Sequence, residues 1–501
     1  MKKLISSVLV AVMAISINTA KADNISFEEA REAAAYFMSC YTGNDKLTVD
    51  DMKLVYQINN ENLGIPASYF FNCANDGWVI IAGTTVVDPI IGFNADGLLN
   101  PDCFPANMRW WVENYSSSIA EVQDLDAEND YPDDPAWIAL KTKTYKGVTK
   151  ERQIILMSEA WNQGDDRVPT YNYYCPKTSN GGNRTAVTGC VATAMSQIFH
   201  YYRYPKKGQG LARYWLRMQL VYEDSAASMP NVELKYNFND SAIFNYGMMP
   251  NVPFDKNGNQ QCSDEEIHEI ARLMYAAGVS VKMAYLPDGS GASSEDVPSA
   301  AMNYFKYKRG TLIMRNGTTD TTFVYGIRRQ LVNRDVLYMC GASPSGTGRD
   351  AAGHAWVCDG YQEVDSNKYH MNWGWGGGAN GFFNLGRNNL FISSRGYNFK
   401  NRQGYISGMV PPDDSIGVSI VDPEATTQLG SPYPNPAVHA INVPYRTQDA
   451  SELVIYNIEG RPVDTYRVQP GEGEVRVRVD ALPAGVYIYR MNSQTGKFLV
   501  Q

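Results

Sequence analysis

The sequence has little of what marks zinc-binding, nucleic-acid-binding and membrane-spanning proteins. Its 501 residues include eight cysteines and five histidines, and the cysteines form no CxxC pair and no Cys/His metal spacing. A structural zinc site is therefore not expected. Without Lys2, Lys3 and Lys21 of the first segment, 41 basic residues face 53 acidic ones, a net charge of −12, which argues against broad electrostatic binding to nucleic acid. With 44 % hydrophobic residues and no internal repeat, the chain is neither disordered nor fibrous.

The N-terminus has the pattern of a secretory signal peptide. Lys2 and Lys3 form a short positive segment, residues 4–17 are apolar but too few to span a bilayer, and Ala20-Lys21-Ala22 matches a cleavage motif. No later apolar run reaches the ~18 residues of a membrane span. We therefore expect residues 1–22 to be removed and the mature protein to be soluble and exported. Export permits disulfides, yet the low cysteine total favours buried apolar thiols.

Residues 23–145 are predicted to form one α+β region. Ser26 and Glu29 make a capping box ahead of apolar residues at helical spacing, which predicts a helix at the start of the mature chain. The runs 69–73 and 78–82 are rich in aromatic and β-branched residues, and an Asn-Asp-Gly turn separates them. This pattern is typical of a β-hairpin.

Changes in composition divide the rest of the chain. The acidic run 124–134 and the basic run 141–150 predict a solvated connector, which leads into a mixed helix and strand region over 146–410. A Pro-Pro-Asp-Asp breaker opens a polar linker over 411–430, and residues 431–501 are predicted to form a small β-sandwich. The β-forming residues of this last region cluster in the runs 452–458, 474–479 and 486–491.

Cys190 is the candidate nucleophile. It follows Gly189, and apolar residues at positions 191, 194, 195 and 198 recur at the spacing of one buried helix face. The cysteine therefore lies in the first turn of a helix, where unpaired backbone N–H groups and the helix dipole stabilise a thiolate. We expect the pKa of this thiol to fall below its ordinary value of ~8.5. On spacing alone, a plain core cysteine is the alternative.

The general base must come from the five histidines. His200 lies far along the same predicted helix, and is interpreted as a packing or surface residue; His268 and His439 are interpreted as solvated or structural. His354 follows a glycine at the start of an apolar strand, where a rigid element can present an imidazole to a cleft. His370 is a possible competitor within the next predicted strand.

Two further side chains complete the predicted site. An antiparallel return of the chain could bring Asn372 near His354, where the amide oxygen would hold the ring N–H, with Trp373 shielding the bond from water. The side-chain amide of Gln163 and the backbone N–H of Cys190 are candidate donors to an oxyanion. A surface glutamine is the alternative interpretation of Gln163.

Taken together, these motifs closely resemble the streptopain (interpain-like) family of secreted cysteine peptidases, over about residues 150–405. The resemblance implies a papain-like two-lobed fold, with Cys190 as nucleophile, His354 as base and acid, and Gln163 in the oxyanion hole. Asn372 and Trp373 match the family's segment after the histidine, and which of them orients the imidazole stays open. The resemblance also implies that Val281, Ser290 and Gly291 bind substrate. The matching motifs are Trp161-Asn162-Gln163, Cys175-Pro176, Thr188-Gly189-Cys190-Val191, Tyr204-Pro205, Gly353-His354-Ala355-Trp356 and Asn372-Trp373-Gly374-Trp375-Gly376.

The flanking regions resemble two further modules. Residues 23–145 are similar to the family's inhibitory propeptide, which implies a zymogen released by cleavage within 141–152. The C-terminal region looks like the sorting domain of type IX secretion cargo in Gram-negative bacteria, which implies a secreted or surface protein and the secretion machinery as a partner; an autonomous adhesive or carbohydrate-binding sandwich is the alternative. The motifs are Asp76-Gly77-Trp78 and Pro89-Ile90-Ile91-Gly92-Phe93 for the first, and Tyr433-Pro434-Asn435-Pro436 and Leu482-Pro483-Ala484-Gly485 for the second.

The expected function is hydrolysis of peptide bonds in protein substrates through a thioester on Cys190, without a metal or organic cofactor. Two alternatives remain. An amine could intercept the thioester, which would make the protein a transpeptidase, or the protein could be a secreted binding protein that keeps the fold without activity.

Overall fold

The computed structural model divides the chain into two compact units, Met1–Pro412 and Asp413–Gln501. The structure describes residues 23–412 without 75, 105, 130–132, 165–168, 178–184, 217–231, 256–257, 288, 316–319, 343–352, 364–367 and 386–402, and residues 427–500 without 430–431, 433–436, 438, 448, 459–460, 481 and 493. The predicted signal peptide and most of the predicted linker lie outside these residues. Among the described residues, no helix is both long enough and apolar enough to cross a membrane.

The N-terminal region begins with the predicted helix. In α1 (Phe27–Thr42) the Ser26 hydroxyl accepts a hydrogen bond from the Glu29 N–H, and Gly43 ends the helix with φ +69°. The predicted hairpin is confirmed as β2 (Ile65–Cys73) and β3 (Trp78–Ala82). The remaining elements are β1 (Met52–Asn60), β4 (Ile90–Asn94), α2 (Ala106–Asn129) and α3 (Pro135–Lys141).

The prediction of a solvated connector over 124–134 is wrong for its first half. Helix α2 continues to Asn129 because its acidic end is bonded to the neighbouring strand. Asp124 accepts hydrogen bonds from the side-chain amides of Asn60 (2.9 Å) and Asn62 (2.7 Å). Charge alone predicts exposure, whereas these amides hold the carboxylate against the sheet.

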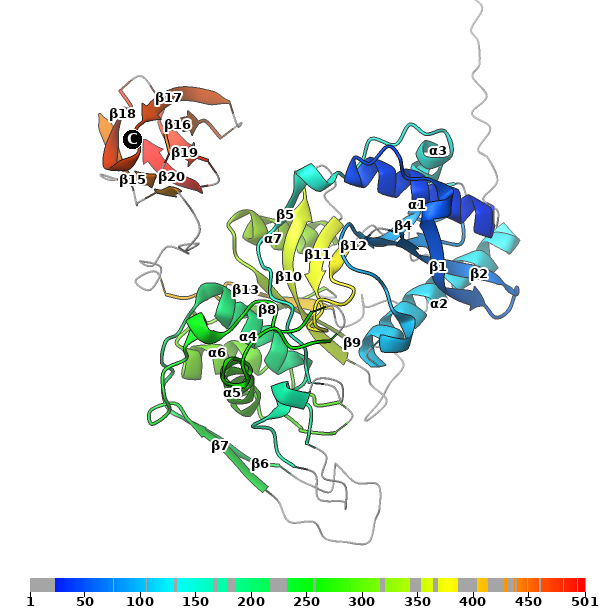
Figure 1. Ribbon diagram of the computed structural model, residues 1–501, viewed down its shortest axis with the longest axis horizontal. Helices are drawn as coiled ribbons and strands as arrows, with labels where there is room; N and C mark the ends of the chain where they lie inside the picture. The colour runs from blue at the N-terminus through cyan, green and yellow to red at the C-terminus, as the bar shows by residue number, and fades with distance from the viewer. Residues whose placement is uncertain are drawn as a thin grey trace, which may run out of the picture. The chain divides into compact units, whose positions relative to one another are not determined.

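A single large sheet runs through the first unit in the order β1-β2-β3-β4-β12-β11-β10-β9-β13-β8, with β5 paired to β10 (Figure 1). The N-terminal strands join the rest where β4 pairs with β12, in the register Phe93↔Phe382 and Gly92↔Phe383. One hydrophobic core extends across this junction. The later strands are β5 (Gln153–Ile155), β8 (Thr311–Met314), β9 (Leu337–Ala342), β10 (Gly353–Gln362), β11 (Lys368–Asn372), β12 (Gly381–Asn384) and β13 (Gly404–Ser407).

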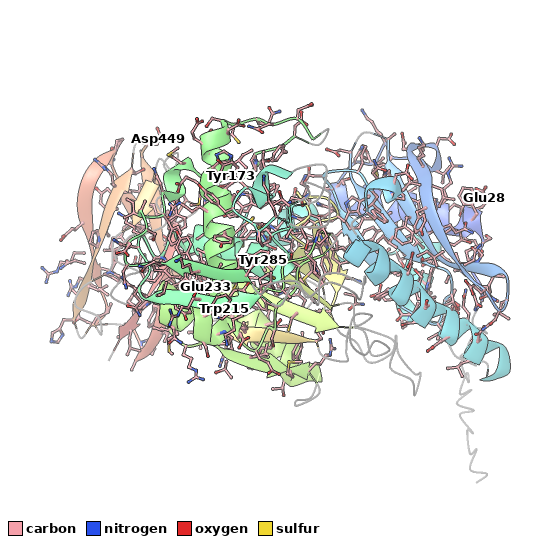
Figure 2. All side chains as sticks on the ribbon, turned by 90° about the horizontal axis from the view of Figure 1, so that it is seen from below. Glu28, Tyr173, Trp215, Glu233, Tyr285 and Asp449 are labelled. Atoms are coloured by element: carbon pink, nitrogen blue, oxygen red, sulfur yellow. The ribbon has the colours of Figure 1, made fainter. Side chains whose placement is uncertain are left out.

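A helical lobe with its own core packs on one side of these strands (Figure 1). It contains α4 (Cys190–Tyr202), α5 (Asp264–Ser280), α6 (Val297–Phe305) and the hairpin of β6 (Leu211–Leu216) and β7 (Val232–Asn237), while α7 (Asp320–Val332) contributes to the core of the N-terminal region. Figure 2 shows Tyr285 inside the helical lobe, where it is buried, whereas Trp215 on the hairpin is exposed. A helical lobe against a sheet lobe confirms the predicted α+β, papain-like two-lobed class.

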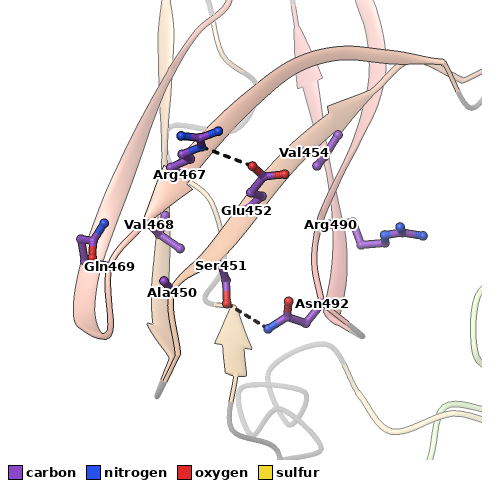
Figure 3. A pocket seen from close by; sticks show the side chains of 9 residues that line it. All are labelled: Ala450, Ser451, Glu452, Val454, Arg467, Val468, Gln469, Arg490 and Asn492. Carbon is purple, nitrogen blue, oxygen red and sulfur yellow. Dashed lines mark hydrogen bonds and ion pairs between the residues drawn. The ribbon is translucent and has the colours of Figure 1, made fainter.

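The C-terminal unit is the predicted small β-sandwich. A three-stranded sheet is formed by β14 (Thr427–Leu429), β15 (Ala440–Thr447) and β18 (Gly471–Arg478), and a four-stranded sheet by β17 (Pro462–Val468), β16 (Ser451–Tyr456), β19 (Gly485–Met491) and β20 (Gln494–Val500). Alternate residues of β19 are buried, as a half-buried strand requires. A surface pocket of about 600 Å³ is lined by residues on and beside the neighbouring strands β16, β17 and β19, with the exposed Glu452–Arg467 ion pair on its wall (Figure 3), and none of the predicted site residues lines it.

Candidate active site

Cys190 is the first residue of helix α4, as predicted. Gly189 precedes it with φ +85°, a conformation that favours glycine, and a Cβ at this position would lie 2.7 Å from the Ser290 carbonyl oxygen. From position 191 to position 201 the helix is buried, so the packing of the helical lobe fixes the direction of its N-terminus. Cys190 itself is only half-buried. The sequence therefore presents this thiol from a rigid element, at the edge of the helical lobe.

Burial raises the pKa of the Cys190 thiol, opposed by hydrogen bonds from the backbone N–H groups of Ala355, Val191 and Cys190 itself. The expectation of a lowered pKa for Cys190 is thus wrong for the chain that still carries its N-terminal region. The helix N-terminus does supply the expected donors, but desolvation outweighs them. Contact with the N–H of Ala355 also brings the thiol beside the strand that carries His354.

His354 lies near the start of β10 and is buried. Its ring lies against Trp375 (4.9 Å between ring centroids), Trp356 (5.9 Å) and Trp373 (6.0 Å). Nε2 lies 3.0 Å from the carbonyl oxygen of Trp373 and donates to it in the tautomer that this contact requires. Burial lowers the pKa of His354 to about 3, although the hydrogen bond to Trp373 opposes the shift. The imidazole is therefore neutral in this form of the chain.

Asn372 does not hold the ring of His354, which corrects the predicted contact. Its amide nitrogen donates to the Glu159 carbonyl (2.6 Å), and its amide oxygen accepts from the Gly374 N–H (3.2 Å). The register explains the difference, because Asn372 pairs with Val357, three residues beyond His354. The sequence left open whether Asn372 or Trp373 contacts the imidazole of His354. In the structure this contact comes from the backbone carbonyl of Trp373.

Gln163 lies beside the nucleophile. Its carbonyl accepts from the Gly189 N–H (3.2 Å), and its N–H donates to the Gly374 carbonyl (3.2 Å). A β-bridge between Asn162 and Trp375 extends this contact. The structure thus brings the segments of Gln163, Cys190 and Trp373 together, and Trp373 in turn contacts His354.

The predicted substrate-binding residues lie in three different environments. Val281 caps the C-terminal end of α5 and is 1 % exposed in the helical core, so the prediction that it contacts substrate is wrong. Ser290 is buried and its hydroxyl is bonded to the backbone of Val187 and Leu286, so it shapes the loop beside Gly189. Gly291 is exposed on that loop and pairs with Ala284.

One buried ion pair near the site was not predicted. His200 is 3 % exposed, which confirms the packing alternative and not the surface one, but its contact was missed: Nδ1 lies 2.7 Å from the Glu159 carboxylate. The sequence did contain a signal, because a histidine among apolar residues of a buried helix needs an acceptor. Of the others, His370 pairs with Asp359 at 2.6 Å in the sheet, and His439 is exposed.

Three family models match successive parts of the chain: the Spi protease inhibitor over residues 22–119, the peptidase C10 family over 161–383, and the secretion system C-terminal sorting domain over 431–501. The C-terminal match identifies the chain as cargo of type IX secretion, exported from the cell.

Curated proteins and solved structures show the same relationship. The thiol protease/hemagglutinin PrtT of Porphyromonas gingivalis is 28 % identical over 359 residues, 70 % of this chain, and this match spans 38 % of PrtT. Streptopain of Streptococcus pyogenes is 27 % identical over 401 residues, 76 % of this chain and 90 % of streptopain. A prointerpain A fragment of Prevotella intermedia shares the fold, with a TM-score of 0.53 at 22 % identity over 72 % of this chain and 99 % of that one. These matches indicate a cysteine protease whose residues 161–383 are similar to the peptidase C10 family, with an inhibitor-like region before them and a secretion sorting domain after them.

Proposed function

We propose that the mature enzyme hydrolyses peptide bonds of protein substrates with Cys190 as nucleophile, His354 as general base and acid, and Gln163 as an oxyanion donor. The observation that carries this proposal is the convergence of three segments. Gly189 N–H bonds to Gln163, Gln163 N–H bonds to the Gly374 carbonyl, and the Ala355 N–H reaches the Cys190 sulfur. Trp373 is the residue that orients the imidazole through its carbonyl.

The chemistry has two steps. The imidazole of His354 takes the thiol proton, the sulfur attacks the substrate carbonyl carbon, and the oxyanion is held by the Cys190 N–H and the Gln163 amide. The imidazolium then gives its proton to the leaving amine as the C–N bond breaks, which leaves a thioester. In the second step the imidazole takes a proton from water, the resulting oxygen nucleophile attacks the thioester, and the C–S bond breaks to regenerate the thiol.

We further propose that residues 23–145 inhibit the catalytic region, 146–410, until cleavage within 141–152. Two observations support this. The N-terminal strands are paired to the edge of the catalytic sheet, and the core that they share with it contains the three tryptophans that lie against His354, which are Trp356, Trp373 and Trp375. Lys141, Lys143, Lys146, Lys150 and Arg152 are all exposed within the predicted cleavage segment. Residues 431–501 then act as the sorting domain for the secretion machinery, joined by the linker 411–430.

Comparing the chain from residue 23 with its Cys190→Ala variant tests the proposal. Under reducing conditions we expect the wild type to lose the N-terminal region, about residues 23–145, and to digest casein. We expect the variant to do neither. Cys262→Ala, a half-buried cysteine outside the site, is the matched control and should behave as wild type.

Three outcomes would contradict this assignment. Activity in Cys190→Ala would exclude Cys190 as nucleophile. Labelling of Cys190 by a thiol-directed peptide electrophile without hydrolysis, together with incorporation of a labelled amine into protein, would identify a transpeptidase. Neither labelling nor hydrolysis after trimming within 141–152 would identify an inactive binding protein.

A further inference from the structure

Glu159 and His200 form a buried pair that the proposed chemistry does not use. The Glu159 carboxylate lies 2.7 Å from Nδ1 of His200, and the two side chains are 5 % and 3 % exposed. The second carboxylate oxygen accepts from the Ser158 N–H at 3.0 Å. Nε2 of His200 has no hydrogen-bond partner among the described residues, so the contact with Glu159 is the one that fixes the ring. Breaking such a buried pair is expensive, because one member is left uncompensated.

Hydrogen bonds lead from Glu159 to the segment that orients His354. The Glu159 carbonyl accepts from the Asn372 amide at 2.6 Å, and the Asn372 amide oxygen accepts from the Gly374 N–H at 3.2 Å. Trp373 lies between these two anchored residues, and its carbonyl is the acceptor for Nε2 of His354. The position of Glu159 is thereby coupled to the position of the imidazole.

The same bonds return to the nucleophile. The Gly374 carbonyl accepts from the Gln163 N–H, and the Gln163 carbonyl accepts from the Gly189 N–H, both at 3.2 Å. Gly189 is in turn bonded into the first turn of α4 by the N–H and hydroxyl of Thr193. Helix α4 is therefore attached to residues 159–163 at both ends, at Gly189 before Cys190 and at His200 near its C-terminus.

We propose that Glu159 and His200 are positioning residues for peptide-bond hydrolysis, which fix the distance between the Cys190 helix, the Gln163 segment and the Trp373 carbonyl. This inference rests on the proposed function of those three groups. A displacement of catalytic groups by about 1 Å can cost on the order of 100-fold in rate. Substrate contacts are not involved, so the effect belongs in kcat and not in KM.

A second buried pair provides the matched control. Asp359 and His370 lie 2.6 Å apart with side chains 1 % and 6 % exposed, which makes this pair as buried as the first. Its carboxylate bonds to His370 within the sheet and makes no hydrogen bond to residues 159–163 or 372–374 in the described part of the chain, so its contact with Glu159 is limited to repulsion between the two carboxylates, which adds to the effect of burial in raising the pKa of Asp359. Loss of either pair should destabilise the fold, whereas only loss of Glu159–His200 should misplace the site.

Steady-state kinetics of the enzyme processed from the full chain test this role. Rates are divided by the number of sites that a thiol-directed peptide electrophile labels at Cys190 at its end point, so that unfolded protein is not counted. For Glu159→Ala we expect kcat to fall roughly 10- to 100-fold while KM changes less than about threefold. Glu159→Gln keeps an oxygen acceptor for His200 and should recover most of kcat. Asp359→Ala should stay within about threefold of wild type in kcat.

His200→Phe is the second variant, because it keeps a ring against Trp161 and removes only the bond. If only one of Glu159→Ala and His200→Phe gives labelled enzyme, that variant decides. The proposal is overturned if kcat per labelled site does not fall, if it falls equally in Asp359→Ala, or if neither variant folds while Asp359→Ala does. Activity that survives Cys190→Ala would instead contradict the proposed function, which keeps the two failures distinct.

Discussion

An α+β region precedes the catalytic region and a β-sandwich follows it, and the two are attached in opposite ways. The N-terminal strands β1–β4 continue the sheet of the catalytic region and share one aromatic core with it, in which Phe93 stacks on Phe382 at 5.5 Å. The C-terminal strands close their own two sheets around a separate core. A region that shares a core with the catalytic region can alter the active site, whereas a region with its own core can act as a sorting signal without affecting catalysis.

Charge adds to the N-terminal attachment. Lys368 of β11 is 2 % exposed, and its ammonium donates to the Asp88 carboxylate (3.1 Å) and to the Ile90 carbonyl (2.7 Å). Asn384 of β12 also donates to Asp88 at 3.2 Å. The N-terminal region thus supplies a carboxylate partner for a buried lysine of the catalytic region, so release of the N-terminal region requires the Lys368 ammonium to become hydrated.

The largest expected effect comes from removing one buried ring on each side. Phe93→Ala should lower the free energy of unfolding of the first unit by about 3 to 5 kcal/mol, because Phe93 is fully buried against Phe37, Tyr41 and Phe382. Phe498→Ala should lower only the second unit's stability, by a similar amount. Urea unfolding in the Cys190→Ala background, which prevents self-digestion, measures both. A shift of both transitions by either variant would contradict separate cores.

Acid should weaken the first unit through His354. Burial lowers the pKa of this imidazole to about 3, against about 6.5 in an unfolded chain. Between these values the unfolded chain binds a proton that the folded chain does not. The stability present above pH 6.5 is therefore lost as the pH falls, by about 1.4 kcal/mol per pH unit. Unfolding of Cys190→Ala at pH 6.5 and pH 4.5, compared with Cys190→Ala/His354→Gln, isolates this contribution from other carboxylates and histidines. Equal pH slopes in the two proteins would show that His354 is not held neutral by burial.

The Asp88–Lys368 pair should have a smaller effect. Asp88→Asn should cost the unprocessed chain about 2 kcal/mol, less than the loss of a fully buried pair, because Asp88 is 28 % exposed. The same variant should shorten the delay before peptidase activity appears in the wild-type background. Asp96→Asn removes the exposed pair with Lys150 and should change stability by less than about 1 kcal/mol. Equal effects of the two substitutions would indicate that burial of Lys368 does not contribute to latency.

Deletion of residues 413–501 should have the smallest effect. Because the two units have separate cores, we expect the free energy of unfolding of the first unit, measured in urea, to change by no more than about 0.5 kcal/mol. We expect kcat/KM on casein to stay within about twofold. Activity assays after purification without secretion measure this directly. A large loss of activity would show that the sorting domain takes part in catalysis.

Local patterns were sufficient for the elements that carry the site. A glycine before Cys190 and a buried helical face after it predicted the start of α4, and clusters of β-forming residues predicted β16, β18 and β19 of the C-terminal sandwich. Local patterns did not predict the contacts between residues that lie far apart in the sequence. The Asn372 contact depended on strand register, and the Glu159–His200 pair joins residues 41 positions apart. The pKa of Cys190 depended on burial, which only the complete fold determines.

Covalent labelling of Cys190 before and after processing tests the central claim most directly. The full chain is treated with a thiol-directed peptide electrophile, and the modified residue is located by mass spectrometry. We expect one label, on Cys190, to appear only with loss of the N-terminal region, and to be absent in His354→Ala at neutral pH because the base is missing. Equal labelling of Cys190 in the unprocessed and processed forms, or a label on another cysteine that accounts for the loss of activity, would contradict the account.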